Sequence, residues 1–192
     1  MINQNLTFTI TFEGYGWSTL CFSSDQWSRE FHASYIGDSP FDFLIAFERL
    51  DNEDDPSTLS FDAEPQITKV AIEPSEESGS NPHSLEEAYN CLIQLEICQE
   101  GEKSIKFLIP FQQLCKLYIQ ALDREIDRLG FLGMVRSWAS PYSSDLPIGL
   151  YLKYKAIALG HYEFIDSLKK NEDDSISSSL KDELRLIEAR LL

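Results

Sequence analysis

Three histidines and four cysteines are the residues of this sequence best suited to hold a metal ion or to act as nucleophiles. They are His32, His83, His161, Cys21, Cys91, Cys98 and Cys115. No two histidines lie two or four residues apart and no two cysteines form a C-x-x-C pair, so the spacing typical of metal ligands is missing. The sequence therefore predicts no metal and no cofactor. It favours cysteines that act as small buried hydrophobes in a reducing compartment.

Motifs for nucleotide binding and catalysis are missing as well. Gly14-Tyr15-Gly16 has no third glycine, and neither a G-K-[ST] loop nor a G-x-S-x-G nucleophile motif occurs. The acidic runs Glu53–Asp55 and Glu172–Asp174 lack the alternate spacing and the central glycine of a calcium-binding loop. We therefore predict that the protein is not an enzyme. The alternative is an active site assembled in space from His32, a cysteine or paired carboxylates.

Negative charge is concentrated in the first part of the chain. The protein has 192 residues and a formal net charge of −16; residues 1–109 contain 20 Asp and Glu against five Lys and Arg, whereas residues 110–192 contain 12 against 11. Such a surface repels the phosphates of nucleic acids and of anionic membranes, so we predict neither as a partner. The excess charge either serves solubility alone or attracts a basic protein partner.

The N-terminal region shows the alternation of a β-meander. Apolar residues occupy every second position of Leu6–Glu13, which is the pattern of a half-buried strand. The glycines of Gly14–Gly16 supply a turn, and Trp17–Ser23 and Trp27–Tyr35 follow as further strands. Strands joined by such short links pair in antiparallel order.

The centre of the sequence adds a short helix, four more strands and a long helix. Gly37–Pro40 predicts the start of the short helix, because Asp38 or Ser39 can cap its free N–H groups. The four strands and the long helix are predicted at Leu59–Ala63, Ile67–Ile72, Cys91–Cys98, Ser104–Ile109 and Pro110–Leu129. Together these elements predict the α+β class: an antiparallel sheet, a meander of about six or seven strands, packed with helices and followed by a helical C-terminal extension.

Residues 131–192 form this extension, in contrast to the acidic sheet domain that we assign to residues 1–130. Residues 148–159, 161–170 and 179–192 have helical patterns. The last helix carries an apolar stripe of Leu180, Leu184, Ile187 and Leu191. The extension either packs on the same domain or offers its stripe to another chain. The alternative function is therefore an assembly subunit that forms a homo-oligomer through its C-terminal helices.

The sequence lacks the features of a membrane span or a secretion signal. The N-terminal segment MINQNLTFTI has no basic start, no long apolar run and no cleavage site. Ile148–Leu159 is the closest approach to a span, but Lys153 and Lys155 interrupt it well short of the roughly 18 apolar residues required. We therefore expect a soluble, cytoplasmic protein.

Four aromatic residues lie around the first turn, namely Tyr15, Trp17, Trp27 and Tyr35. One interpretation is that they pack beneath the sheet. The other is that they form a partly exposed cluster beside acidic loops. Such a cluster suits a protein interface, because Trp and Tyr often act as anchors there.

Short motifs in the first half resemble those of a group of small, uncharacterised bacterial proteins. In chain order they are Glu13–Ser18 (EGYGWS), Phe31–Ile36 (FHASYI), a short helix ending in Ala46–Leu50 (AFERL), and Phe61–Pro65 (FDAEP). They follow a layout of G-x-G-W-S, A-S-Y, a helix and W-D-x-E-P over residues 6–111, with Phe61 in place of Trp. Proteins with this layout are similar to the immunity proteins of contact-dependent and polymorphic toxin systems.

This resemblance implies a non-enzymatic inhibitor that neutralises a basic toxin or nuclease. An acidic face with aromatic anchors would give such an inhibitor a fast association rate and specificity. We therefore expect the carboxylates of residues 1–109 to gather in one outward patch. The predicted partner-binding residues are Tyr15, Trp17, Asp51, Glu53, Asp54, Asp55, Asp62 and Glu64.

Overall fold

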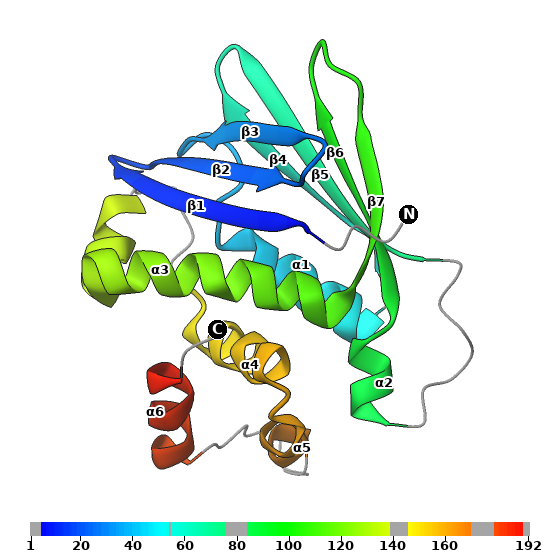
Figure 1. Ribbon diagram of the computed structural model, residues 1–192. Helices are drawn as coiled ribbons and strands as arrows, with labels where there is room; N and C mark the ends of the chain where they lie inside the picture. Colours follow the sequence, from blue (N-terminus) through cyan, green and yellow to red (C-terminus); the bar gives the residue numbers. More distant parts are fainter. Residues whose placement is uncertain (1–4, 54, 76–83, 139–145, 170–178, 190–192) are drawn as a thin grey trace.

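The structure is a computed structural model that describes residues 5–53, 55–75, 84–138, 146–169 and 179–189. Threonines and large apolar residues alternate along the first strand of its first sheet. The strands of this sheet are β1 (Thr7–Gly14), β2 (Trp17–Ser23) and β3 (Ser28–Ala33), paired antiparallel in the order β1-β2-β3 (Figure 1). Phe8, Ile10 and Phe12 are buried, and the threonines between them face solvent. The period-two pattern therefore defines an inner and an outer face of this sheet.

Along the chain, helix α1 (Asp42–Glu53) follows the first sheet and precedes the strands of a second sheet. The strands β4 (Ser57–Ala63), β5 (Gln66–Pro74), β6 (Leu92–Gln99) and β7 (Ile105–Pro110) pair antiparallel in chain order, with helix α2 (Leu85–Tyr89) between β5 and β6. The α+β class is confirmed, but the single meander is wrong, because the described strands form two sheets of three and four. After β3 the chain enters a helix and not a tight turn, and β4 does not pair with β3 in a hairpin.

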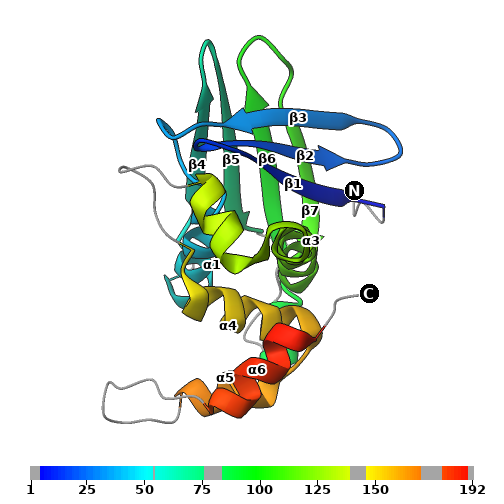
Figure 2. The ribbon, with the colours of Figure 1, turned by 90° about the vertical axis from the view of Figure 1, so that its left-hand side faces the viewer.

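Strand β3 lies across the four-stranded sheet. At one end, the ring of Trp27 packs on Phe107 of β7, with ring centroids 5.5 Å apart. At the other end, the Ser34 hydroxyl donates to the backbone oxygen of Asp62 in β4, at 2.6 Å. Figure 2 shows β1–β3 running across the upright strands β4–β7. The two sheets therefore pack in the crossed arrangement, with their inner faces toward one core.

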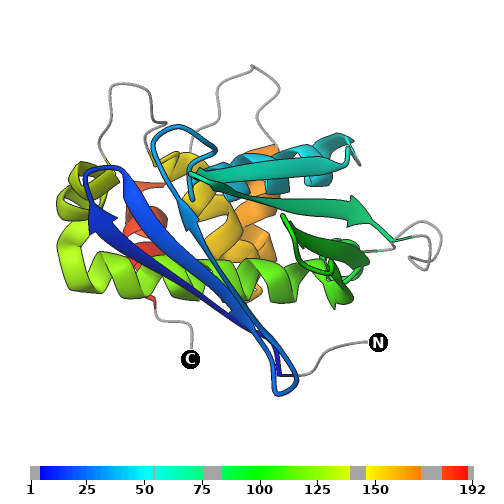
Figure 3. The same ribbon diagram turned by 90° about the horizontal axis from the view of Figure 1, so that it is seen from above.

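Helix α3 (Phe111–Trp138) covers β1, and the three-stranded sheet runs diagonally over it when seen from above (Figure 3). The helix is interrupted at Gly130, where φ is 70° and ψ is 161°. The predicted end of the long helix at Leu129 therefore marks a break, after which a second helical segment continues to Trp138. Glycine permits the positive φ at this break.

Two charged side chains of α3 hold the backbone of Phe12 at the edge of β1. The Phe12 N–H donates to Glu125 Oε2 at 2.8 Å, and Arg128 Nη2 donates to the Phe12 oxygen at 2.8 Å. Arg128 also pairs with Glu125. This pair, which we call the edge clamp, makes the hydrogen bonds that a neighbouring strand would make.

The core between the sheets and the helices is rich in aromatic rings. The ring of Phe43 in α1 lies between 5.3 and 6.5 Å from five others, those of Phe8, Phe22, Phe47, Phe61 and Tyr118. These rings come from β1, β2, α1, β4 and α3. They tie both sheets to both helices, since tilted and edge-on aromatic pairs add to the gain from burial.

Three helices form a further layer on the side of α3 that faces away from the sheets (Figures 1 and 2). They are α4 (Ile148–Leu159), α5 (Tyr162–Lys169) and α6 (Leu180–Glu188). Lys155 of α4 is completely buried, and its ammonium group lies 2.8 Å from Asp123 of α3 and 3.0 Å from the hydroxyl of Tyr151. It also donates to the backbone oxygen of Ile187 in α6, at 3.4 Å. One buried lysine therefore connects α3, α4 and α6.

Candidate functional site

The turn between β1 and β2 places three consecutive residues in the left-handed backbone region. Gly14, Tyr15 and Gly16 have φ angles of 98°, 57° and 78°. Space at Gly16 is also tight, because a Cβ there would lie 3.0 Å from the Cβ of Tyr35. The Gly16 N–H donates to the backbone oxygen of Ser137 at 3.0 Å, so the turn is fixed against the end of α3.

Tyr15 combines backbone strain with full exposure. Its side chain is 93% exposed. A bulky residue in the left-handed region costs roughly 1–2 kcal/mol, and Asn or Gly would serve the same turn with less strain. Burial of the ring does not offset this strain, because the ring lies in solvent. A strained aromatic residue that gains nothing from burial is a candidate for a functional role.

Three further large apolar side chains are exposed next to this turn. Trp17 begins β2, and Tyr35 and Ile36 follow β3; their exposed fractions lie between 39% and 56%. We call Tyr15, Trp17, Tyr35 and Ile36 the aromatic tip. Trp27, the fourth aromatic residue of the predicted cluster, is instead half-buried against Phe107. The interface interpretation therefore fits Tyr15, Trp17 and Tyr35, and the packing interpretation fits Trp27.

The segment that carries Tyr35 and Ile36 is bound to strand β4. A Cβ at Gly37 would lie 2.7 Å from the backbone of both Ser60 and Asp62, so the two chains are in close contact. The backbone N–H of Asp38 donates to the Ser60 oxygen at 2.9 Å, and Asp38 Oδ2 accepts from the Ser60 N–H at 2.6 Å. The aromatic tip and the end of β4 therefore lie side by side.

Two of the predicted carboxylates are at this end of β4. Asp62 is half-buried and its Oδ1 accepts from the Glu64 N–H at 3.2 Å, while Glu64 itself is exposed. Glu13, which was not predicted, is exposed on β1 next to the turn. We call Glu13, Asp62 and Glu64 the flanking acids. Of the eight predicted residues, Tyr15 and Trp17 thus lie at the β1–β2 turn, and Asp62 and Glu64 lie at the end of β4 that contacts the segment after β3.

The structure places Asp51 in a different environment. Its side chain is only 12% exposed and lies 2.7 Å from the ammonium group of Lys153, which also contacts Glu48 at 2.6 Å. The Tyr89 hydroxyl donates to Asp51 at 3.4 Å, and burial together with the Asp51 charge raises the pKa of Tyr89. Asp51 is therefore neutralised inside the protein and does not contribute to an outward acidic surface.

Of the remaining predicted acids, only Asp55 has a described side chain. Asp55 is exposed just before β4 begins, at the opposite end of that strand from Asp62. A strand of this length spans roughly 20 Å. Glu53 ends α1 but its side chain is outside the description, and Asp54 lies outside the described residues. The expected single patch is thus divided between the two ends of β4.

The outer face of the three-stranded sheet carries a line of three polar side chains that sequence analysis did not identify. The Thr19 hydroxyl donates to Glu13, and the same oxygen lies 2.9 Å from His32 Nδ1. Glu13 comes from β1, Thr19 from β2 and His32 from β3. The sequence places His32 on the polar face of a strand, but the register that sets it opposite Thr19 becomes known only from the pairing of β2 with β3.

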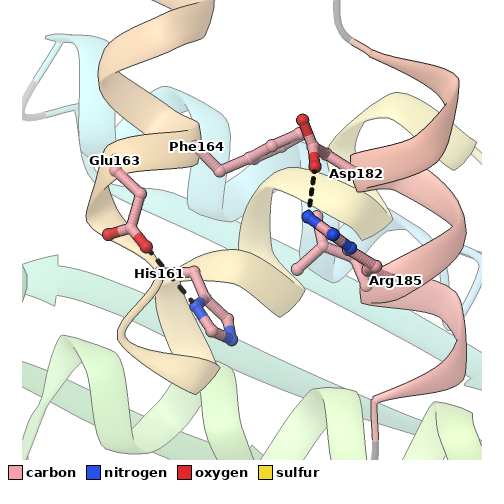
Figure 4. Close-up of a pocket in the computed structure, with 6 residues that line it drawn as sticks. His161, Glu163, Phe164, Asp182 and Arg185 are labelled. Atoms are coloured by element: carbon pink, nitrogen blue, oxygen red, sulfur yellow. Dashed lines mark hydrogen bonds and ion pairs between the residues drawn. The ribbon is translucent and has the colours of Figure 1, made fainter.

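A shallow cavity of about 380 Å³ lies between α5 and α6 (Figure 4). It is lined by His161, Glu163, Phe164, Asp182, Arg185 and Leu186. Arg185 pairs with Asp182 at 3.1 Å, and His161 Nδ1 lies 3.9 Å from Glu163. Acidic and basic groups are thus matched locally around this cavity. No buried nucleophile with a neighbouring base appears among these six residues.

In the part of the chain that the structure describes, no group of three His, Cys, Asp or Glu side chains is placed to hold a metal ion. Among the same residues, no helix has both the length and the apolar character needed to cross a membrane.

Comparison with protein-family models, with curated proteins and with solved structures gave no match for this chain.

Proposed function

We propose that this protein is a non-enzymatic binding module that contacts a basic protein partner through the aromatic tip and the flanking acids. The observation that carries this proposal is Tyr15, a strained and almost fully exposed aromatic residue. Trp and Tyr dominate the energetics of many protein interfaces, because they bury a large area while losing little conformational freedom. Trp17 and Tyr35 extend the surface on which such contacts form.

The charge of the flanking acids defines the partner. Among the described residues, Glu13, Asp62 and Glu64 form no ion pair with a lysine or arginine of the chain. Unpaired carboxylates around an apolar centre attract a cationic surface, accelerate its association and disfavour acidic competitors. A basic protein meets both requirements.

The narrower proposal is an immunity-like inhibitor of a basic toxin or nuclease that acts in the bacterial cytoplasm. The segments that carry the resemblance to immunity proteins include Glu13–Ser18, Tyr35-Ile36 and Asp62–Glu64. These segments also form the aromatic tip and its flanking acids. An inhibitor that covers a basic active site needs contact residues but no catalytic residues of its own.

Affinity purification with matched baits tests the proposal. We expect the wild-type protein to retain a basic protein from cells of its source, and to release it at high salt because the attraction is screened. Tyr15→Asn should lose this protein. Ile148→Ala, which alters an exposed apolar residue of α4, should keep it. An identical set of retained proteins for all three baits would contradict the proposal.

A second candidate function, a homo-oligomeric assembly subunit, is favoured by helix α6. Leu180 and Leu184 are 69% and 49% exposed on the same side of this helix. Deleting the C-terminal helices would expose the core around Lys155, so the double change Leu180→Glu with Leu184→Glu is the cleaner test. Sedimentation that shows a dimer for the wild type and a monomer for this variant would support the assembly function. A wild-type monomer would exclude it at the concentration used.

A further inference from the structure

The outer face of the three-stranded sheet places four functional side chains next to one another beside the aromatic tip. Trp17 and Thr19 are alternate residues of β2, so both project from the same face. His32 is the direct cross-strand partner of Thr19 on β3. Glu13 lies in the irregular part of the β1–β2 pairing, between the pairs formed by Phe12 and Gly14.

The hydrogen bonds of Thr19 determine which atoms of its neighbours remain free. A threonine hydroxyl has one proton, and a carboxylate can only accept, so Thr19 donates its proton to Glu13. The contact of 2.9 Å with His32 Nδ1 then requires that His32 donate to the Thr19 oxygen. In a neutral imidazole the other nitrogen, Nε2, carries a lone pair and is an acceptor.

The groups that this site offers to a partner are therefore of two kinds. The carboxylate of Glu13 accepts hydrogen bonds, Nε2 of His32 accepts them whenever the imidazole is neutral, and the ring of Trp17 presents a face of negative electrostatic potential. A complementary group is flat and positively charged, and it carries several N–H donors in one plane. Guanidinium has these properties, whereas the ammonium group of lysine is a compact point charge that stacks less well on an indole.

We infer that the Glu13–Thr19–His32 line and Trp17 form a recognition site for an arginine side chain of the protein partner. This inference rests on the proposed function, since it names the side chain by which a basic partner is recognised. Thr19 is a positioning residue: its hydroxyl holds the Glu13 carboxylate and the His32 ring toward each other. Trp17 and Glu13 make the contacts to the guanidinium group.

Two peptides of equal charge separate arginine recognition from general attraction. Nona-arginine and nona-lysine, each labelled at one end, are titrated with the protein at physiological ionic strength and followed by fluorescence anisotropy. We expect both peptides to bind, and nona-arginine to bind about three- to fivefold more tightly, as a solvent-exposed cation–π contact of about 1 kcal/mol implies.

Matched variants assign this preference to the site. Trp17→Leu and Thr19→Val should reduce the affinity for nona-arginine to that for nona-lysine, while Thr19→Ser, which keeps the hydroxyl, should retain the preference. Glu13→Gln should also lose it. Glu30→Gln is the control: it removes one negative charge from the same outer face of the sheet, on β3, but not from the Glu13–Thr19–His32 line. It should weaken the binding of both peptides equally.

The outcomes distinguish this inference from the proposed function. Equal affinities of the wild-type protein for the two peptides would overturn arginine recognition but leave the acidic binding surface in place. A preference that survives Thr19→Val and Trp17→Leu would also overturn it. Failure of both peptides to bind would count against the proposed function itself, because a cationic partner would then not be attracted.

Discussion

Two regions of this molecule are rich in carboxylates, and they use them in opposite ways. Where α4 packs on α1 and α3, Lys153 neutralises Glu48 and Asp51, and Lys155 neutralises Asp123, all in buried or half-buried positions. At the aromatic tip, the flanking acids have no basic partner among the described residues and lie around exposed rings. The difference shows that a run of acids in a sequence does not define a binding surface. What matters is whether a lysine from a distant helix reaches it.

The pKa of Glu48 illustrates how the buried pairs work. Burial alone would raise this pKa, but the hydrogen bond and the charge of Lys153 hold it below its usual range. Burial would likewise lower the pKa of Lys153, and its two carboxylate partners raise it instead. In both cases the partner outweighs the loss of water, so the charged forms persist.

The largest expected effect comes from breaking the pair of Lys155 and Asp123. Lys155→Met leaves a carboxylate buried without its counter-charge and should reduce the free energy of unfolding by about 3–5 kcal/mol. The double variant Lys155→Met with Asp123→Asn should recover most of this loss, because Asn can still accept from Tyr151 without a charge. Urea denaturation measures both. A single variant as stable as the wild type would show that the pair is not what secures α4.

Removal of the Lys153 charge should have a smaller effect, which depends on pH. Lys153→Met leaves Glu48 and Asp51 close together without a cation and should cost about 1–3 kcal/mol at pH 7. Because the pKa of Glu48 is lowered by folding, its contribution is present above the usual glutamate range, near pH 4, and is lost as the pH falls through the folded-state pKa.

The raised pKa of Lys153 has the opposite sign. Its contribution is complete below the usual lysine value, near pH 10, and is lost as the pH rises through the folded-state pKa. Thermal unfolding from pH 3 to 11 should therefore show that the difference between wild type and Lys153→Met shrinks at both extremes. A difference that is constant with pH would mean that Lys153 stabilises the protein through packing alone.

The smallest effect on stability is expected at the aromatic tip, where a substitution should stabilise the protein and not destabilise it. Tyr15→Asn places a residue that tolerates the left-handed region at φ 57° and should raise the free energy of unfolding by up to about 1 kcal/mol. The same change should abolish partner binding. A loss of stability would indicate that the ring of Tyr15 supports the fold, and would remove the main argument for the binding surface.

The strands of the first sheet were predicted well because their burial alternates. Trp17–Ser23 is observed as predicted, and Leu6–Glu13 is shifted by one residue. The division into two sheets was not predicted, because a period of two identifies a strand but not its neighbours. The long helix was predicted to end at Leu129, which is where the structure has the break at Gly130, but the second helical segment up to Trp138 was not predicted.

Only some residues of the candidate binding surface could be predicted from the sequence, because its pattern does not specify contacts between distant residues. Tyr15 and Trp17 could be identified from residue type and their place at a glycine turn. The burial of Asp51 could not, because Lys153 is about a hundred positions further along the chain. The contact of Thr19 with His32 likewise depends on strand register, which follows from the packing of the whole sheet.

The edge clamp bears on how the protein avoids polymerisation. Exposed aromatic side chains such as those of the aromatic tip favour self-association, and an edge strand with free backbone groups can then extend into a fibril. Glu125 and Arg128 already occupy the backbone of Phe12, and Asp38 occupies that of Ser60. The outward backbone groups of these two residues are therefore already hydrogen-bonded within the molecule, and a second copy cannot pair with them as an added strand.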